Sequence, residues 1–201
     1  MPDFFATEVM RRAAVPVSEF EWLKPLTKVR SIGRRDAFCR LGQTNHEVGF
    51  VEKGIFQVYQ LTEEGEHVVL DFLFPGDFAL ALTTAAKGEP SGVSIDAVTP
   101  CVVRAWPYAL RLEANARHSE WARFETMLVE EAFIRKQNRY QALLTMSAQR
   151  RYAMLDTEFT PLWKEIPQHL LASYLHVTPQ YLSRLKRVPV APLRGGANSA
   201  N

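Results

Sequence analysis

The order of hydrophobic and polar residues divides the chain into successive parts with different periodicities. Residues 4–13 and 18–26 have the spacing of short amphipathic helices, and Ser18 followed by Glu21 predicts a capping box at the start of the second helix. From Lys28 to Trp106 the pattern changes to short strand-like runs separated by turn residues, namely 28–32, 36–41, 46–53, 55–61, 66–74 and 93–106. This spacing predicts an antiparallel sandwich or barrel, with a hairpin around residues 63–66.

After Pro107, which suits the first turn of a helix, the pattern becomes helical. Residues 118–147 contain no Gly or Pro and predict one helix of roughly 45 Å at 1.5 Å per residue. Its apolar residues face more than one side: Trp121, Phe124, Leu128, Val129, Phe133, Ile134, Tyr140, Leu143 and Leu144. One side can pack on the strands, and we expect the other to pack on a second copy of this helix in a homodimer.

Residues 168–187 read QHLLASYLHVTPQYLSRLKR and have the spacing of a helix-turn-helix. Ala172 is the small residue that lets two helices cross closely. Thr178 is suited to cap the second helix, with Pro179 at its first position. His176 occupies the turn position that usually requires Gly, so we expect it to adopt a left-handed conformation. The apolar inner positions are Leu171, Leu175, Val177, Leu182 and Leu185.

A helix-turn-helix places its second helix, here about 178–187, in the major groove of double-stranded DNA. Gln180 can pair with adenine and Arg184 with guanine, and both lie on one helix face because they are four residues apart. Gln168 and His169, at the start of the first helix, are expected to meet a phosphate. Further candidates for phosphates or marginal base edges are Thr178, Tyr181, Ser183, Lys186 and Arg187.

Composition and charge change this picture only in part. The 201 residues are 47% hydrophobic and 23% charged, which is typical of an ordinary globular chain. The formal charge is only +2, but residues 135–201 carry ten Lys or Arg against three acids. The resulting +7 coincides with the helix-turn-helix pattern and leaves −5 on residues 1–134.

Other sequence features concern location and reactive groups. No apolar run is long enough to span a membrane, and charges interrupt residues 1–21, so we expect a cytoplasmic protein without a signal peptide. Cys39 and Cys101 are far apart in strand-like runs and are expected to be buried thiols. Neither a disulfide nor a metal site is predicted.

The order of strands, long helix and helix-turn-helix resembles the Crp/Fnr transcription regulators. Residues 38–42 (FCRLG), 48–54 (VGFVEKG) and 74–78 (FPGDF) resemble that family's strand turns and the start of its phosphate-binding cassette. The C-terminal residues closely resemble a large subgroup common in Bacteroidetes-type bacteria: Arg151-Tyr152, Pro167, 171–175 (LASYL) and Leu182-Ser183-Arg184. The similarity covers about residues 20–187.

The resemblance implies an α+β fold with an N-terminal antiparallel, jelly-roll-like β-roll and flanking helices. It divides the chain into an effector domain (1–117), a dimerisation helix (118–147), a helix-turn-helix domain (148–187) and a flexible tail (188–201). It also implies that a homodimer binds a pseudo-palindromic site, that the effector domain shifts the DNA-binding domains through the long helix, and that RNA polymerase is a partner. No winged element is evident between Ala148 and Ile166, so the C-terminal domain is expected to be a reduced version.

The effector site departs from the family pattern. Cyclic-nucleotide binders of this fold use a Glu for the ribose and an Arg for the cyclic phosphate. After Gly76-Asp77-Phe78, the Glu position falls near Ala81, between Leu80 and Leu82, and the Arg position falls at Pro90 or Ser91. An unpaired phosphate in an apolar pocket would be costly, so we expect no cyclic nucleotide in the usual mode.

No cofactor is predicted, and an unidentified small-molecule effector stays open. Lys87 is the one candidate substitute for the phosphate-binding Arg. Two isolated cysteines cannot supply the iron–sulfur cluster of the oxygen-sensing branch. His46 and His67 are candidate haem ligands in principle, but both are expected to be surface strand residues.

Two other functional classes are alternatives for this sequence. Gly42, His46, Glu52 and Gly54 resemble a cupin metal motif, but the required His-x-His pair has Val48 as its second member, so no enzyme is expected. The remaining alternative is a β-roll interaction module with a non-functional helix-turn-helix. Salt-dependent DNA binding would separate that alternative from a regulator.

Overall fold

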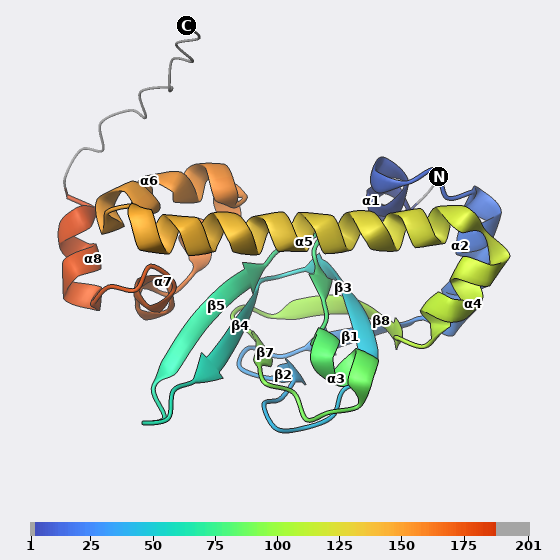
Figure 1. Ribbon diagram of the computed structural model, residues 1–201, viewed down its shortest axis with the longest axis horizontal. Coiled ribbons are helices and arrows are strands. Elements are labelled where there is room, and N and C mark those ends of the chain that lie inside the picture. Colours follow the sequence, from blue (N-terminus) through green and yellow to red (C-terminus); the bar gives the residue numbers. More distant parts are fainter. Residues whose placement is uncertain (1–2, 188–201) are drawn as a thin grey trace, which may run out of the picture.

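The computed structural model describes residues 3–187, apart from the side chains of residues 156–158. A 27-residue helix, α5 (Ser119–Thr145), runs along the molecule, with two sheets beneath its middle and shorter helices at both ends (Figure 1). The predicted tail at 188–201 lies outside the described residues. None of the described helices is both long and apolar enough to cross a membrane.

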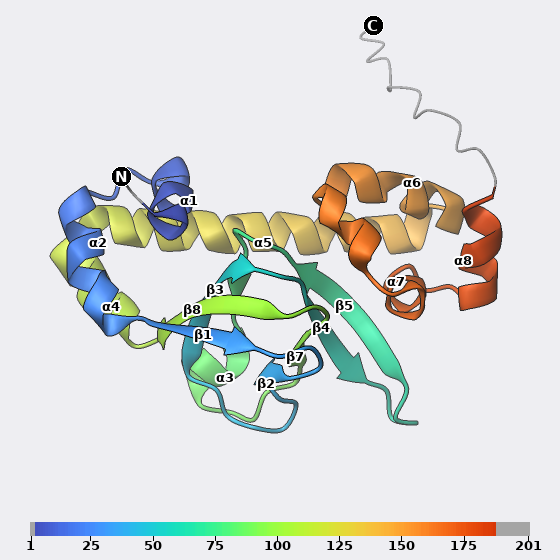
Figure 2. The same cartoon turned by 180° about the vertical axis from the view of Figure 1, so that it is seen from behind.

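Antiparallel strands form two sheets on one side of α5 (Figure 2). Each sheet has four strands, in the orders β1-β8-β3-β6 and β2-β7-β4-β5. The strands are β1 (Lys28–Ile32), β2 (Ala37–Cys39), β3 (Glu47–Lys53), β4 (Phe56–Leu61), β5 (His67–Leu73), β6 (Phe78–Ala79), β7 (Ser94–Ala97) and β8 (Cys101–Pro107). The predicted sandwich or barrel of antiparallel strands is thereby confirmed.

Alternation of side chains explains why these segments form strands. In β8, Cys101, Val103 and Ala105 are buried and the residues between them are partly exposed, as expected for a strand with one face on the core. The predicted hairpin is also present, with β4 paired to β5 from Phe56↔Leu73 to Leu61↔His67. Gly65 closes its turn at φ 82°, a left-handed conformation that glycine adopts without steric cost.

The strand expected at 93–106 is in fact two strands, β7 and β8. Pro100 lies between them, and it has no N–H to donate to a ladder. The turn at Gly54 packs closely on this break, because a Cβ atom there would lie 2.5 Å from the carbonyl oxygen of Pro100. The two-residue strand β6 is too short to show a period, and the sequence pattern did not predict it.

The N-terminal helices are α1 (Phe4–Arg12) and α2 (Val17–Leu23), followed by a 3₁₀ turn η1 (Lys24–Leu26). The capping box predicted at Ser18 and Glu21 is wrong. Helix α2 begins at Val17, so Ser18 lies within its first turn, and Pro16 occupies the cap position without a side-chain bond. Helix α1 is capped instead by Asp3, whose carboxylate accepts the N–H of Ala6 at 2.9 Å.

Pro107 does not begin a helix, contrary to the prediction. It ends β8, paired with Glu47, and the N–H of Tyr108 donates to the carbonyl of His46, so the ladder still holds the chain there. Helix α4 (Leu110–Arg117) follows before α5. The remaining short helix, α3 (Leu82–Lys87), lies after β6.

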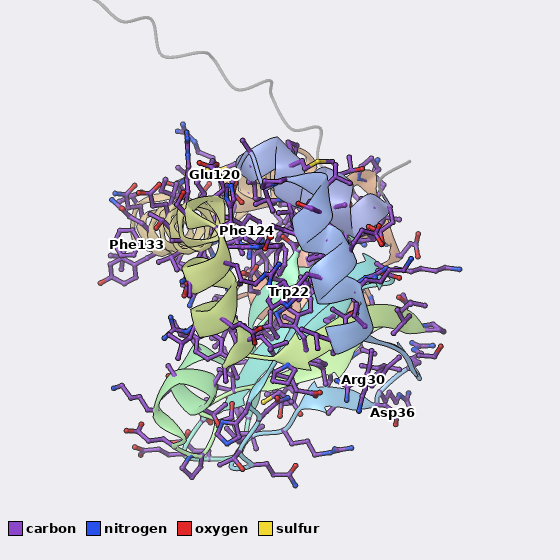
Figure 3. The ribbon with its side chains drawn as sticks, turned by 90° about the vertical axis from the view of Figure 1, so that its right-hand side faces the viewer. Trp22, Arg30, Asp36, Glu120, Phe124 and Phe133 are labelled. Atoms are coloured by element: carbon purple, nitrogen blue, oxygen red, sulfur yellow. The ribbon has the colours of Figure 1, made fainter. Side chains whose placement is uncertain are left out.

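Helix α5 matches the predicted long helix closely and has two different sides. Trp121 and Phe124 are buried against the N-terminal helices, whereas Phe133 points away from the body of the molecule (Figure 3). Residues 129, 133, 140 and 144 recur at helical spacing and remain 55–67% exposed: Val129, Phe133, Tyr140 and Leu144. The expected second apolar face is therefore present on this helix.

The C-terminal helices share a hydrophobic cluster with the β-roll. They are α6 (Ala148–Glu158), the 3₁₀ helix η2 (Pro161–Glu165), α7 (Gln168–Tyr174) and α8 (Pro179–Leu185). Phe72 and Phe74, from the β-roll, belong to the same buried cluster as Leu155, Phe159 and Tyr174. The stretch between Ala148 and Ile166, where no wing was expected, contains α6 and η2.

Candidate nucleic-acid interface

Helices α7 and α8 pack on each other through the small and apolar residues that the sequence singled out. Ala172 is 1% exposed and Leu182 is fully buried between the two helices and their neighbours. The connecting turn has His176 at φ 51°, the left-handed conformation expected in place of a glycine. Partial burial lowers the pKa of His176, and the positive charges of Arg139 and Arg151 lower it further.

The start of α8 is fixed by local hydrogen bonding. The hydroxyl of Thr178 accepts the N–H of Tyr181 at 3.2 Å, and Pro179 occupies the first helical position, as predicted. These contacts satisfy one of the free N–H groups at the helix start, so the helix begins at a defined residue.

The outer face of α8 is open to solvent. Gln180 and Arg184 are both exposed, one turn apart, and the Arg184 guanidinium lies 5.4 Å from the centre of the Tyr181 ring. A cation over an aromatic face restricts the orientations of a long side chain, so Tyr181 helps to hold Arg184 outward. Thr178, Lys186 and Arg187 are also exposed along this helix or at its ends.

Two of the candidate contact residues bind each other in the free protein. The amide of Gln168 donates to the hydroxyl of Ser183 and, at 3.1 Å, to the carbonyl of Pro179. Gln168 therefore ties the start of α7 to α8. His169, the next residue in α7, is exposed.

Three arginines of the basic C-terminal part are engaged inside the molecule. Arg135 pairs with Asp71 and Asp77, each at 3.3 Å. Arg139 donates to the carbonyl of Tyr174 at 2.9 Å, and Arg151 donates to that of Leu175 at 2.8 Å. These two arginines satisfy carbonyls at the end of α7, where a cation also complements the helix dipole.

Burial shifts the pKa values of Arg135 and its partner Asp71 in opposite directions. Burial raises the pKa of Asp71, and the positive charge of Arg135 partly offsets this by lowering the same pKa. The two carboxylates raise the pKa of Arg135 against the effect of its own burial. The charge at Arg135 therefore holds the turn at residues 74–78 against α5, a role that charge counting along the sequence could not reveal.

The residues expected to line an effector pocket lie around the turn at residues 74–78 and around α3. Gly76 has φ 97°, Asp77 accepts the N–H of Phe74 at 2.7 Å, and Phe78 stacks on Phe50 and Phe124. Ala81 is buried, whereas Leu80 is half-buried and Leu82 is exposed.

Neither of the two positions at which the resemblance places the phosphate-binding Arg supplies a cation. Pro90 is exposed, and the hydroxyl of buried Ser91 donates to the carbonyl of Val93 at 2.7 Å. Lys87, the candidate substitute, is exposed at the end of α3.

The interior of the β-roll is apolar and closely packed. A Cβ atom at Gly49 would lie 2.7 Å from Val103 in the same sheet and 2.9 Å from Phe38 in the other sheet, so the Phe38 side chain reaches across the space between the two sheets. Cys39 and Cys101 are both buried there, as predicted, and burial raises the pKa of the Cys101 thiol to about 11.

Candidate metal ligands do not converge. Within residues 3–187, no three His, Cys, Asp or Glu side chains are placed to hold a metal ion. His46 and His67 are exposed, and His67 stacks on Tyr59 with ring centres 4.0 Å apart. Glu52, from the weak cupin-like pattern, pairs with Arg104 at 2.8 Å.

Comparison with known proteins gives a family match for the β-roll and a wider similarity in fold. Residues 29–113 match the family model of the cyclic nucleotide-binding domain. No curated protein sequence matches the chain.

Solved structures that are similar over most of the chain include FixK2 from Bradyrhizobium japonicum, with 18% identity, a TM-score of 0.68 and coverage of 80% of this chain and 82% of that one. The c-di-GMP responsive global regulator CLP from Xanthomonas campestris has 13% identity, a TM-score of 0.67 and coverage of 85% and 89%. A CRP-family transcriptional regulator from Thermus thermophilus has 17% identity, a TM-score of 0.59 and coverage of 78% and 82%. The chain thus shares the fold of these proteins, two of which are described as regulators.

Proposed function

We propose that the chain is a DNA-binding transcription regulator of the Crp/Fnr type and not an enzyme. The main observation in support is the exposed face of α8, where Gln180 and Arg184 lie one turn apart. The start of this helix is fixed by the Thr178 cap, and its inner face is fixed by the burial of Leu182. Such a face fits the major groove, because Gln can pair with adenine and Arg with guanine. In this proposal, residues 148–187 are the DNA-binding domain and 1–117 the effector domain.

The proposed active form is a homodimer built on α5. The residues that support it are Val129, Phe133, Tyr140 and Leu144, which form an apolar stripe open to solvent. A second copy of the same helix covers such a stripe with matching spacing. The two copies of α8 then reach successive major grooves of a pseudo-palindromic site about 34 Å apart.

The effector domain is proposed not to bind cAMP or cGMP in the family's usual mode. Ala81 offers no carboxylate for a ribose, and Pro90 and Ser91 offer no cation for a cyclic phosphate. No cofactor is proposed. An effector of another chemistry, if present, would act by shifting the balance between conformations.

Two other parts of the proposal rest on resemblance alone. They are contact with RNA polymerase and a place in the Bacteroidetes-type subgroup on the strength of residues 151–184. A cytoplasmic location is also proposed, from the sequence pattern rather than from resemblance.

Selection of bound sequences from a random pool of DNA, repeated at two salt concentrations, tests the proposed function. We expect an enriched inverted repeat whose binding weakens as salt rises, because phosphate contacts release counterions. Binding without sequence enrichment, or no binding at all, would instead favour an interaction module with a non-functional helix-turn-helix.

A further inference from the structure

Strand β5 lies at the edge of its sheet. Within residues 3–187, β4 is the one strand that pairs with it, so in this part of the chain the backbone groups on its other side have no strand partner. Val69, near the middle of β5, is fully buried, and an unpaired N–H at such a place is costly. The backbone groups of this edge therefore require partners from another part of the chain.

Ser173 of α7 supplies two of these partners. Its hydroxyl accepts the N–H of Val69 at 3.0 Å and donates to the carbonyl of His67 at 3.1 Å. One hydroxyl thus occupies the place that a neighbouring strand would take along two residues of β5. This pairing fixes both the position of α7 and its rotation about its own axis.

Arg139 of α5 completes the attachment. Its guanidinium donates to the carbonyl of Val69 at 3.3 Å and to the carbonyl of Tyr174 at 2.9 Å. The same group lies 3.6 Å from the centre of the Tyr174 ring. Arg139 therefore joins three elements, α5, β5 and the end of α7.

Apolar packing continues behind these polar contacts. The ring of Phe72, on β5, lies 5.5 Å from that of Tyr174, and both belong to one buried cluster. While α7 is attached in this way, Gln180 and Arg184 of α8 remain exposed. The attached arrangement is therefore compatible with contact to DNA.

We propose that Ser173 and Arg139 are positioning residues for the DNA-binding face, which fasten α7 to the edge of β5 so that the sheet sets the orientation of α8. The inference rests on the proposed function. A dimer gains affinity from two half-sites only if both copies of α8 are held at the right separation. A fixed α7 keeps that separation without any contact between these two residues and DNA.

The test uses the full-length protein and two separate measurements. Ser173→Ala removes the hydroxyl, Ser173→Thr restores one, and Ser18→Ala is the control at an exposed helical serine. Arg139→Lys keeps the charge but loses the forked geometry, with Arg123→Lys as its control at an exposed position of α5. The measurements are the exchange rate of the Val69 amide hydrogen, and the affinities for a selected inverted repeat and for a single half-site.

For Ser173→Ala we expect the Val69 amide to exchange about tenfold faster or more, because its hydrogen-bond partner is lost. The affinity for the inverted repeat should fall about five- to tenfold, while that for the half-site stays unchanged. Ser173→Thr should restore both values, and Arg139→Lys should weaken the inverted repeat in the same selective way. The two controls should match the wild type.

Each contrary outcome has a distinct meaning. An unchanged Val69 exchange rate would show that the attachment does not form in solution. Faster exchange with equal losses on both DNAs, or with no loss, would show that the attachment does not position α8. If the wild type binds no DNA, the proposed function and the positioning role both fail, and the exchange rates still decide whether α7 is fastened to β5.

Discussion

Arg184 is the residue on which the proposed reading of DNA depends most. Its side chain is exposed and lies beside the ring of Tyr181. Other cations of the C-terminal part, such as Arg139 and Arg151, are instead engaged in contacts within the molecule. A bidentate contact from arginine to guanine distinguishes one base from the other three. Lysine contacts to phosphate add affinity without such discrimination.

Arg184→Ala is expected to weaken binding to the selected site by about 1–3 kcal/mol and to relax the preference at one base pair of each half-site. Lys186→Ala, two residues away, is the comparison. It should weaken all sequences alike and lower the dependence of log affinity on log salt by about one unit. Titration of wild type and variants on matched and single-base-changed sites measures both effects, and equal binding by Arg184→Ala and wild type would remove Arg184 from the reading face.

Glu19 shows how a buried acid contributes to stability. Hydrogen bonds from Arg117 lower its pKa most, and the indole N–H of Trp121, 3.3 Å from the carboxylate, lowers it further against the effect of burial. A carboxyl with a lowered folded pKa stabilises the fold above its unfolded pKa. That stabilisation disappears as the pH falls through the folded pKa.

Glu19→Gln should therefore lower the free energy of unfolding by about 1–3 kcal/mol at pH 7. The gap between wild type and variant should narrow progressively below about pH 5. Urea unfolding across a pH series measures this, with Glu21→Gln, at an exposed position of the same helix, as the control. If the difference in unfolding free energy between wild type and variant stays constant from pH 7 to pH 3, the charge of Glu19 is not the cause of the stabilisation.

At the scale of elements, the turn between α7 and α8 carries identifiable backbone strain. His176 has φ 51°, a region that a residue with a Cβ atom enters at a cost and that glycine enters freely. His176→Gly is therefore expected to raise the free energy of unfolding by up to about 1 kcal/mol, even after the greater entropy of glycine in the unfolded chain. His176→Val should lower it, and a destabilised glycine variant would show that contacts of the imidazole outweigh the strain.

Helix α5 has an exposed apolar stripe that a folded monomer would leave in water. Phe133→Glu places a charge in this stripe and is expected to shift the protein from dimer to monomer at micromolar concentration, because the charge would have to be buried between the two copies. Asn138→Glu, at an exposed position on another side of the same helix, is the control and should leave the dimer intact. Sedimentation equilibrium measures both, and a dimeric Phe133→Glu protein would place the interface elsewhere.

At the scale of the whole molecule, the shared hydrophobic cluster predicts that the β-roll and the C-terminal helices unfold together. Phe72 is fully buried and its ring faces Phe159 and Tyr174. Phe72→Ala should lower stability by about 3–5 kcal/mol while keeping a single transition, observed by circular dichroism and by amide exchange in both parts. Two separate transitions in the wild type, with α6 to α8 melting first, would contradict a common folding unit.

The sequence predicted the elements and much of the candidate reading face, because both depend on local spacing. Alternation identified most strands, the absence of Gly and Pro identified α5, and the four-residue spacing of Gln180 and Arg184 already put them on one face. The left-handed turn at His176 and the cap at Thr178 are also local, and both are found as predicted. The segments that resemble the Crp/Fnr regulators lie in a fold that the chain shares with a CRP-family transcriptional regulator of solved structure.

Only the tertiary structure decided which side chains are used inside the molecule. The charge count along the sequence included Arg135, Arg139 and Arg151 in the basic part expected to face DNA. In the structure, Arg135 pairs with Asp77 in the turn at residues 74–78. Arg139 and Arg151 donate to carbonyls at the end of α7. The sequence pattern did not predict a contact for Ser173, because its partner Val69 lies 104 residues earlier in the chain. Residue type and spacing report on neighbours within a few positions. Contacts between distant segments arise only when the sheets and helices pack, which is why the sequence predicted the face of α8 that carries Gln180 and Arg184 but not the attachment of α7 to β5.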